Sequence, residues 1–176
     1  MKKKKAIIWV IKIVLISIIC SMVFMLISTE VIGRAGIVVS FFVLALFIVI
    51  GILFDIIGIA VMSASETPFH SMASRRERGA GESLRLIRNA EKVATYCNDV
   101  IGDVVGIISG TTAALVAGSL MLSLNTENML FQLLILGLVT GLTIGGKSIG
   151  KIIALKNNTV IVHNIGKLIS LLKIKK

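Results

Sequence analysis

The sequence has few of the charged residues that a water-soluble domain needs. Charged residues make up 16% of the 176 residues, and hydrophobic residues make up 56%. A soluble domain carries roughly 25% charged residues. The chain therefore lacks the polar side chains to cover a soluble globule, and its apolar composition excludes a disordered chain as well. We predict an integral membrane protein.

Proline, aromatic residues and cysteine are also scarce. One proline and 5% aromatic residues exclude a proline-rich tract and an aromatic platform for nucleic acid. The two cysteines, Cys20 and Cys97, lie in or beside apolar runs and give neither a disulfide framework nor zinc-site spacing. The net charge of +10 can indicate nucleic-acid binding. Because the charges flank apolar segments, we interpret them instead as signals of membrane orientation and expect no nucleic-acid partner.

Four continuous apolar segments predict four transmembrane helices. They are residues 6–28, 36–63, about 95–122 and about 129–146. A spanning helix needs roughly 20 apolar residues, and each segment is close to that length or longer. The runs lack the ten-residue alternation of a β-barrel. The predicted fold class is an all-α integral membrane protein in contact with the lipid bilayer.

The first apolar segment follows four consecutive lysines, as in a secretory signal peptide. Its apolar run is longer than the usual 7–15 residues, and no clear cleavage site follows. We therefore interpret residues 1–35 as an uncleaved anchor with its outer loop, with a cleaved signal peptide as the alternative. The remaining residues, 36–176, form the main membrane domain.

The lysines and arginines give the orientation. They gather at the N-terminus, in residues 64–94 and after residue 146, whereas the connectors 29–35 and 123–128 share only Arg34. Under the positive-inside rule, both termini are cytoplasmic, and the expected location is the plasma membrane.

Two cytoplasmic regions are expected to form amphipathic helices. In residues 64–94, Pro68 and the glycines at 79 and 81 predict breaks, and residues 81–96 have helical spacing of apolar residues. The basic residues there suit an anionic leaflet, but a solvated helix that only sets topology explains them equally well. Residues 152–176 are expected to lie along the inner interface, with a bend at Asn157–Asn158, and not to form a fifth span.

The third and fourth apolar segments each carry a ladder of glycines. The ladders are Gly102, Gly106 and Gly110, and Gly137, Gly141 and Gly145. Small residues at four-residue spacing let helix backbones approach closely in lipid. We expect the two helices to pack on each other or across a dimer.

Polar groups converge at the inner ends of three predicted spans. Ser63 ends the second span, Asn98 and Asp99 begin the third, and Gly146 and Lys147 end the fourth. Oxygen-rich sites of this kind suit Mg²⁺. Alternatively, the charges snorkel to the interface, Asn98 only hydrogen-bonds between helices, and Lys147 only pairs with a carboxylate.

Asp103 lies four residues after Asp99, so the two carboxylates share a helix face. We find no catalytic triad order, phosphate-binding glycine loop or metal-binding histidine pair in the sequence. We therefore do not expect an enzyme.

Three motifs resemble the transmembrane domain of the cyclin M / CorB–CorC (CNNM) family. The first is the "SASET" signature, here Ser63-Ala64-Ser65-Glu66-Thr67. The second is an asparagine motif that opens the next helix, here Cys97-Asn98-Asp99-Val100-Ile101-Gly102. The third is a Gly-Glu-x-x-Pro-Lys pattern, at which this chain has Gly146-Lys147-Ser148-Ile149-Gly150-Lys151. The resemblance covers roughly residues 36–170.

The resemblance implies a homodimeric Mg²⁺/Co²⁺ transport domain. Its ion would be held by Ser63, Asn98 and the carbonyl of Gly146, but the family's acidic ligand is replaced here by Lys147. Asp99 or Asp103 would then supply the missing negative charge. The chain resembles a short form of the family without the cytoplasmic CBS domains. The alternative is a non-transporting structural or regulatory membrane protein in which Lys147 takes the place of the ion.

Overall fold

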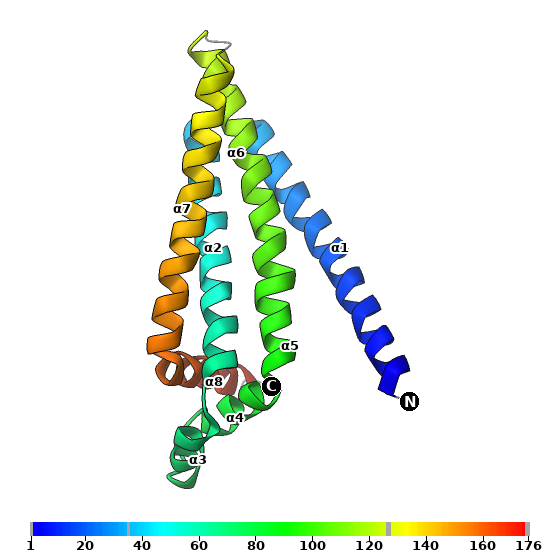
Figure 1. Cartoon of the computed structure of the whole chain (residues 1–176), viewed down its shortest axis with the longest axis vertical. Helices are drawn as coiled ribbons and strands as arrows, with labels where there is room; N and C mark the ends of the chain where they lie inside the picture. The colour runs from blue at the N-terminus through cyan, green and yellow to red at the C-terminus, as the bar shows by residue number, and fades with distance from the viewer. Residues whose placement is uncertain (1, 35, 126–127, 175–176) are drawn as a thin grey trace. The chain divides into compact units, whose positions relative to one another are not determined.

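A computed structural model describes residues 2–34, 36–125 and 128–174, which form helices and no strand (Figure 1). Within these ranges, four helices are long and apolar enough to cross a membrane. They are Ile7–Glu30, Ile37–Ser63, Ala90–Ser123 and Met129–Lys156. These four helices confirm the predicted all-α membrane fold with four spans. Long apolar helices suit lipid because they satisfy their own backbone hydrogen bonds.

The helices follow one another with short connections. They are α1 (Lys2–Arg34), α2 (Ile37–Ser63), α3 (Glu66–Ser74), α4 (Ala80–Arg88), α5 (Ala90–Ala94), the π-helical segment η1 (Thr95–Gly102), α6 (Asp103–Ser123), α7 (Met129–Lys156) and α8 (Asn158–Ile174). The chain divides into two compact units. The first comprises Met1–Ile52 and Asp99–Lys147, and the second comprises Leu53–Asn98 and Ser148–Lys176.

In the first unit, α1 packs against α6, and α6 also shares a core with α2. Phe47 of α2 and Ile108 of α6 are buried in that core, and Phe24 of α1 meets Phe47 edge to face at 6.2 Å between ring centroids. The hydroxyls of Ser28 and Thr112 form a buried hydrogen bond of 2.9 Å between α1 and α6. The first apolar segment thus contacts α6 along one side, whereas most of its large apolar side chains are exposed.

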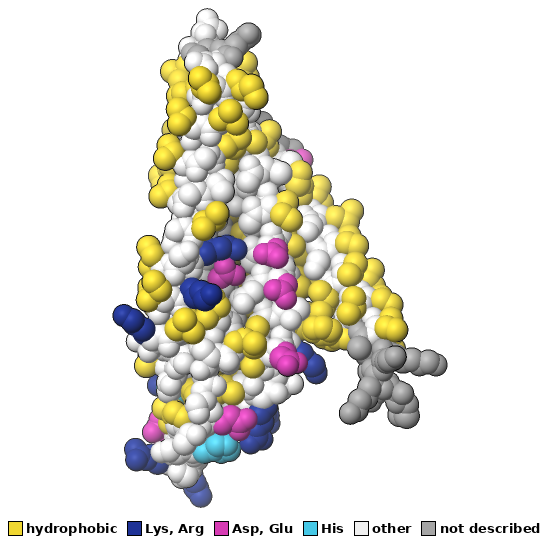
Figure 2. Space-filling model, in the orientation of Figure 1, with side chains coloured by type: hydrophobic (Ala, Val, Ile, Leu, Met, Phe, Trp, Pro, Cys, Tyr) yellow, Lys and Arg dark blue, Asp and Glu magenta, His cyan; other side chains and the backbone are white. Residues whose placement is uncertain are grey.

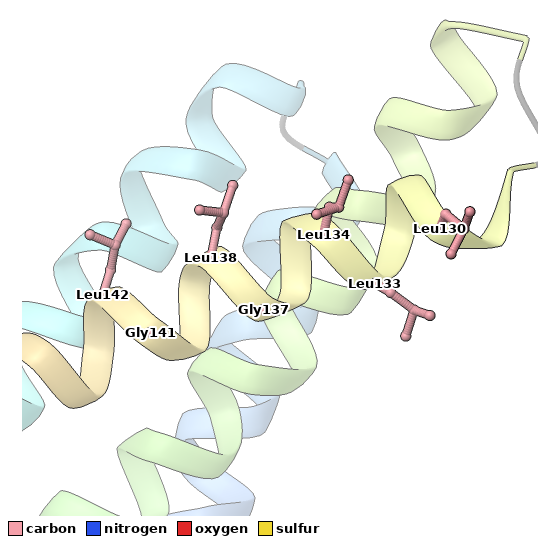
Figure 3. A pocket seen from close by; sticks show the side chains of 7 residues that line it. All are labelled: Leu130, Leu133, Leu134, Gly137, Leu138, Gly141 and Leu142. Atoms are coloured by element: carbon pink, nitrogen blue, oxygen red, sulfur yellow. The ribbon is translucent and has the colours of Figure 1, made fainter.

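The glycine ladders do not form a tight contact within the chain. A Cβ atom built at Gly106, Gly110, Gly137, Gly141 or Gly145 would meet no atom within 4 Å. The expectation that the two helices pack on each other through these ladders is therefore wrong for these five glycines. Around Gly137 and Gly141, leucine side chains of α7 border an open apolar groove, as Figure 3 shows.

In the second unit, α3, α4 and α8 surround the C-terminal end of α2. Their shared core contains Val61 of α2, Phe69 of α3 and Val162 of α8, all with 0% exposure. Ser65 caps α3, because its hydroxyl accepts a hydrogen bond of 3.4 Å from the Thr67 N–H. The serines of the SASET segment therefore end one helix and start the next.

Pro68 lies in the first turn of α3, so the predicted break at this residue is wrong. The first N–H groups of a helix have no intrahelical partner, and proline is tolerated there because its missing N–H removes no hydrogen bond. The break lies earlier, at Ala64 and Ser65.

The break at Gly79 is confirmed, since this residue adopts a left-handed conformation with φ of 84°. It leads into α4, which packs closely on α8. The buried Ser83 hydroxyl of α4 lies 3.0 Å from the Gly79 carbonyl and 3.1 Å from the Val162 carbonyl of α8, and can donate to either. A Cβ atom at Gly166 would overlap the Ser83 hydroxyl, so a glycine lets the two helices approach. The amphipathic helix predicted at 81–96 is divided into α4, α5 and the start of η1.

The C-terminal bend is confirmed at Asn157, but its position shows that the fourth span continues further than expected. α7 extends to Lys156, and α8 begins at Asn158. Apolar residues such as Ile149 and Ile153 continue the helical pattern after Gly146, and no proline interrupts it before Asn157.

Glu66 at the start of α3 gives a prediction for acidic pH. Its carboxylate lies 3.1 Å from His70 Nε2 and accepts a hydrogen bond of 3.4 Å from Arg88 Nε. The His70 hydrogen bond is the largest cause that lowers the pKa of the Glu66 carboxyl below its ordinary value of 4.5, and Arg88 adds to it. The stabilisation is therefore complete above about pH 4.5 and is lost as the pH falls through the lowered pKa.

We expect Glu66→Gln to lower the melting temperature slightly at neutral pH and to flatten its decline below pH 4.5. Melting curves from neutral pH to about pH 3 measure this, with the exposed Glu91→Gln as the matched control. Parallel acid limbs for wild type and Glu66→Gln would contradict the prediction.

Candidate functional site

Asn98 lies within η1, in the third span. Its Oδ1 atom is buried and has no hydrogen-bond partner among the described residues. π-helical turns inside α-helices occur frequently at functional sites, because the extra residue redirects neighbouring side chains. An amide oxygen left unpaired inside a membrane span costs about 1–3 kcal/mol.

The Asn98 amide packs directly against Gly58 of α2. A Cβ atom at Gly58 would lie 2.7 Å from Asn98 Cγ and 3.0 Å from Nδ2, and would overlap Oδ1. Only a residue without a Cβ atom leaves room for the amide at this position. The sequence pattern missed Gly58, because a lone glycine in an apolar span does not show which side chain approaches it.

Ser63, the last residue of α2, is exposed and connected to α8. Its hydroxyl donates to the Ala60 carbonyl at 3.3 Å. The Asn158 Nδ2 atom donates to the Ser63 carbonyl at 3.0 Å and to its hydroxyl oxygen at 3.4 Å. Sequence reasoning used Asn158 only as a sign of a bend and missed this contact, which joins residues 95 positions apart.

Ser63 and Asn98 lie at different depths of the second unit. Asn98 contacts Gly58, and Ser63 lies five residues after Gly58 on the same helix. Five residues correspond to about 7.5 Å along the helix axis and about 140° around it. Ligand oxygens lie about 2.0–2.1 Å from a bound Mg²⁺. The described arrangement of the second unit therefore does not bring these two oxygens into one coordination sphere.

The other candidate residues belong to the first unit. Asp99 and Asp103 are exposed, one in η1 and the other at the start of α6. Gly146 is half-buried, and a Cβ atom there would contact the Ile52 side chain of α2. Lys147 is also half-buried. Among the described residues, we find no group of three or more His, Cys, Asp and Glu side chains that could hold a metal ion.

Comparison of the chain with protein-family models, with curated proteins and with solved structures finds no match. The resemblance to the CNNM transmembrane domain therefore depends on the three sequence motifs alone. What it implies about function is a proposal.

Proposed function

We propose that this membrane protein transports divalent cations, Mg²⁺ or Co²⁺, across the plasma membrane, as the CNNM / CorB–CorC resemblance implies. Both termini are cytoplasmic in this proposal, since lysine and arginine are concentrated on that side. The protein would act as a homodimer, and the open glycine face of α7 at Gly137 and Gly141 would allow a second copy to approach closely (Figure 3).

The observation that carries the proposal is the buried, unpaired Oδ1 atom of Asn98. Amide and carboxylate oxygens are the ligands that Mg²⁺ prefers. Asp99, which follows Asn98 in η1, and Asp103, one turn later, are the carboxylates nearest to it in sequence. Ser63 lies at a different depth of α2 and is hydrogen-bonded to Asn158, so it would join such a site only after α2 and η1 shift relative to each other.

Flux measurement tests the proposal. Proteoliposomes with wild-type protein should take up Mg²⁺ or Co²⁺, and Asn98→Ala should reduce the rate at least about tenfold, as loss of a metal-site residue does. The matched control is Asn164→Ala, an exposed asparagine of α8, which should transport like wild type. Equal rates for wild type and Asn98→Ala would contradict a role for Asn98 in transport.

The second candidate function is a non-transporting membrane protein, and the half-buried Lys147 favours it. An ammonium group at the family's acidic ligand position repels a divalent cation and takes its place. In this case wild-type protein gives no flux. Lys147→Glu then restores an acidic ligand, so its melting temperature should rise with Mg²⁺ concentration, because a ligand of the folded state stabilises it. Flux by the wild type excludes this alternative.

A further inference from the structure

Helix α8 begins at the depth at which a membrane span ends. Asn158, its first residue, is hydrogen-bonded to Ser63, the last residue of α2. α2 has 27 residues, and Asp55 is its one ionisable side chain. A helix of this length extends about 40 Å, close to the thickness of a bilayer with its headgroups. The start of α8 therefore lies in the interfacial region of the bilayer.

The direction of α8 keeps it near that interface. Within the second unit, α8 turns away from α7 at Asn157 and runs crosswise to the end of α2 (Figure 1). A helix that runs across the end of a span lies along the membrane surface and does not lead away from it.

α8 has two apolar faces, and the protein covers only one of them. Val162 and Gly166 are buried, and Ser83 of α4 contacts both. The opposite side, the outer face of α8, carries Val160, Leu168, Leu171 and Leu172, which are exposed by 60%, 59%, 52% and 67%. At 100° per residue, these side chains lie within an arc of about 120°. The outer face is thus a mainly apolar stripe, interrupted by the exposed Asn164.

Two lysines lie beside this stripe. Lys156 precedes α8, and the exposed Lys167 lies one turn before Leu171 on the same side of the helix. Residues 53–98 and 148–176 together contain twelve lysines and arginines but five aspartates and glutamates. Figure 2 shows basic side chains at the end of the second unit that α3 and α4 occupy. An apolar helix face bordered by cations is typical of helices that bind anionic membrane surfaces.

We propose that the outer face of α8 inserts into the headgroup region of an anionic leaflet and that Lys156 and Lys167 contact its acidic phospholipids. The occupant is the bilayer surface, because α8 starts at the end of a span and its charge is complementary to acidic lipids. α8 would thus hold the packed α3–α4–α8 platform against the membrane. This proposal does not depend on cation transport.

Tryptophan fluorescence in reconstituted full-length protein tests this. Trp9, the one tryptophan, is replaced by phenylalanine, and Leu171→Trp then reports from the outer face of α8. In vesicles of brominated phosphatidylcholine with phosphatidylglycerol, bromine should quench this tryptophan at least about twofold more than one at the exposed Ser74 of α3, as expected for an inserted helix face. Lys167→Glu should reduce the additional quenching that phosphatidylglycerol causes.

Three results would overturn the proposal. Quenching of Leu171→Trp by aqueous iodide and not by bromine would place the outer face in water. Protection from both quenchers, increasing with protein density in the vesicle, would identify a second copy as the occupant. Equal bromine quenching with and without phosphatidylglycerol would remove the role of anionic lipid. If Leu171→Trp does not fold, Leu168→Trp probes the same face.

Discussion

Replacing Gly79 by alanine should destabilise the second unit by about 2–5 kcal/mol. The left-handed backbone at φ of 84° costs a residue with a Cβ atom about 1–2 kcal/mol. In addition, the new Cβ would lie 2.7 Å from the Gly166 carbonyl carbon and 2.8 Å from Lys167 Cα, and would overlap the Lys167 nitrogen. Such overpacking costs about 1–3 kcal/mol. Because these are backbone atoms of α8, no side-chain rotation relieves the contact.

Gly81 offers a matched control two residues away. It is exposed in α4, and a Cβ atom there would meet nothing within 4 Å. Gly81→Ala should therefore be neutral or stabilise the protein by up to about 1 kcal/mol, because alanine is the better helix former. Thermal melting in detergent and limited proteolysis of the segment between α2 and α5 measure both variants. Identical melting and proteolysis of the two variants would refute the described packing of Gly79 on α8.

The membrane spans could be predicted because lipid imposes a simple requirement on sequence. A spanning segment must be long, apolar and helical, and residues 37–63 meet this condition without a proline. The end of α7 was harder to predict, since Lys147 and Lys151 suggested an earlier boundary than the observed Lys156. The predicted end at residue 146 assumed that a charged residue ends the helix. Lysine is in fact compatible with a helix that continues.

The candidate site could be predicted only as a set of residues and not as a geometry. The positions of Ser63 and Asn98 along their predicted spans place both residues near the inner membrane surface. The distance between them depends on which residue of α2 Asn98 contacts, and that residue is Gly58. The π-helical turn that redirects Asn98 has no local sequence signature. The Asn158–Ser63 hydrogen bond joins distant segments, so no periodicity indicates it. The glycine ladders show the same limit, because spacing identifies a smooth helix face but not its partner.

Replacing Gly58 by alanine should also lower the stability of the protein strongly, because the new Cβ atom would overlap the Asn98 amide. We expect a loss of about 1–3 kcal/mol from overpacking. If the proposed function holds, cation flux should also fall, since the displaced amide is the proposed ligand. Gly110→Ala on α6 is the control, because a Cβ atom there would meet nothing within 4 Å.

The double variant Gly58→Ala/Asn98→Ala separates packing from function. Asn98→Ala removes the amide that the new Cβ would overlap, so the double variant should be at least as stable as Gly58→Ala alone. The two changes should then be non-additive by about 1–2 kcal/mol, as expected for residues in contact. Its cation flux should stay low, because the proposed ligand oxygen is missing. Melting curves and flux for the four members of this cycle give both quantities, and strictly additive stabilities would show that Asn98 does not pack on Gly58.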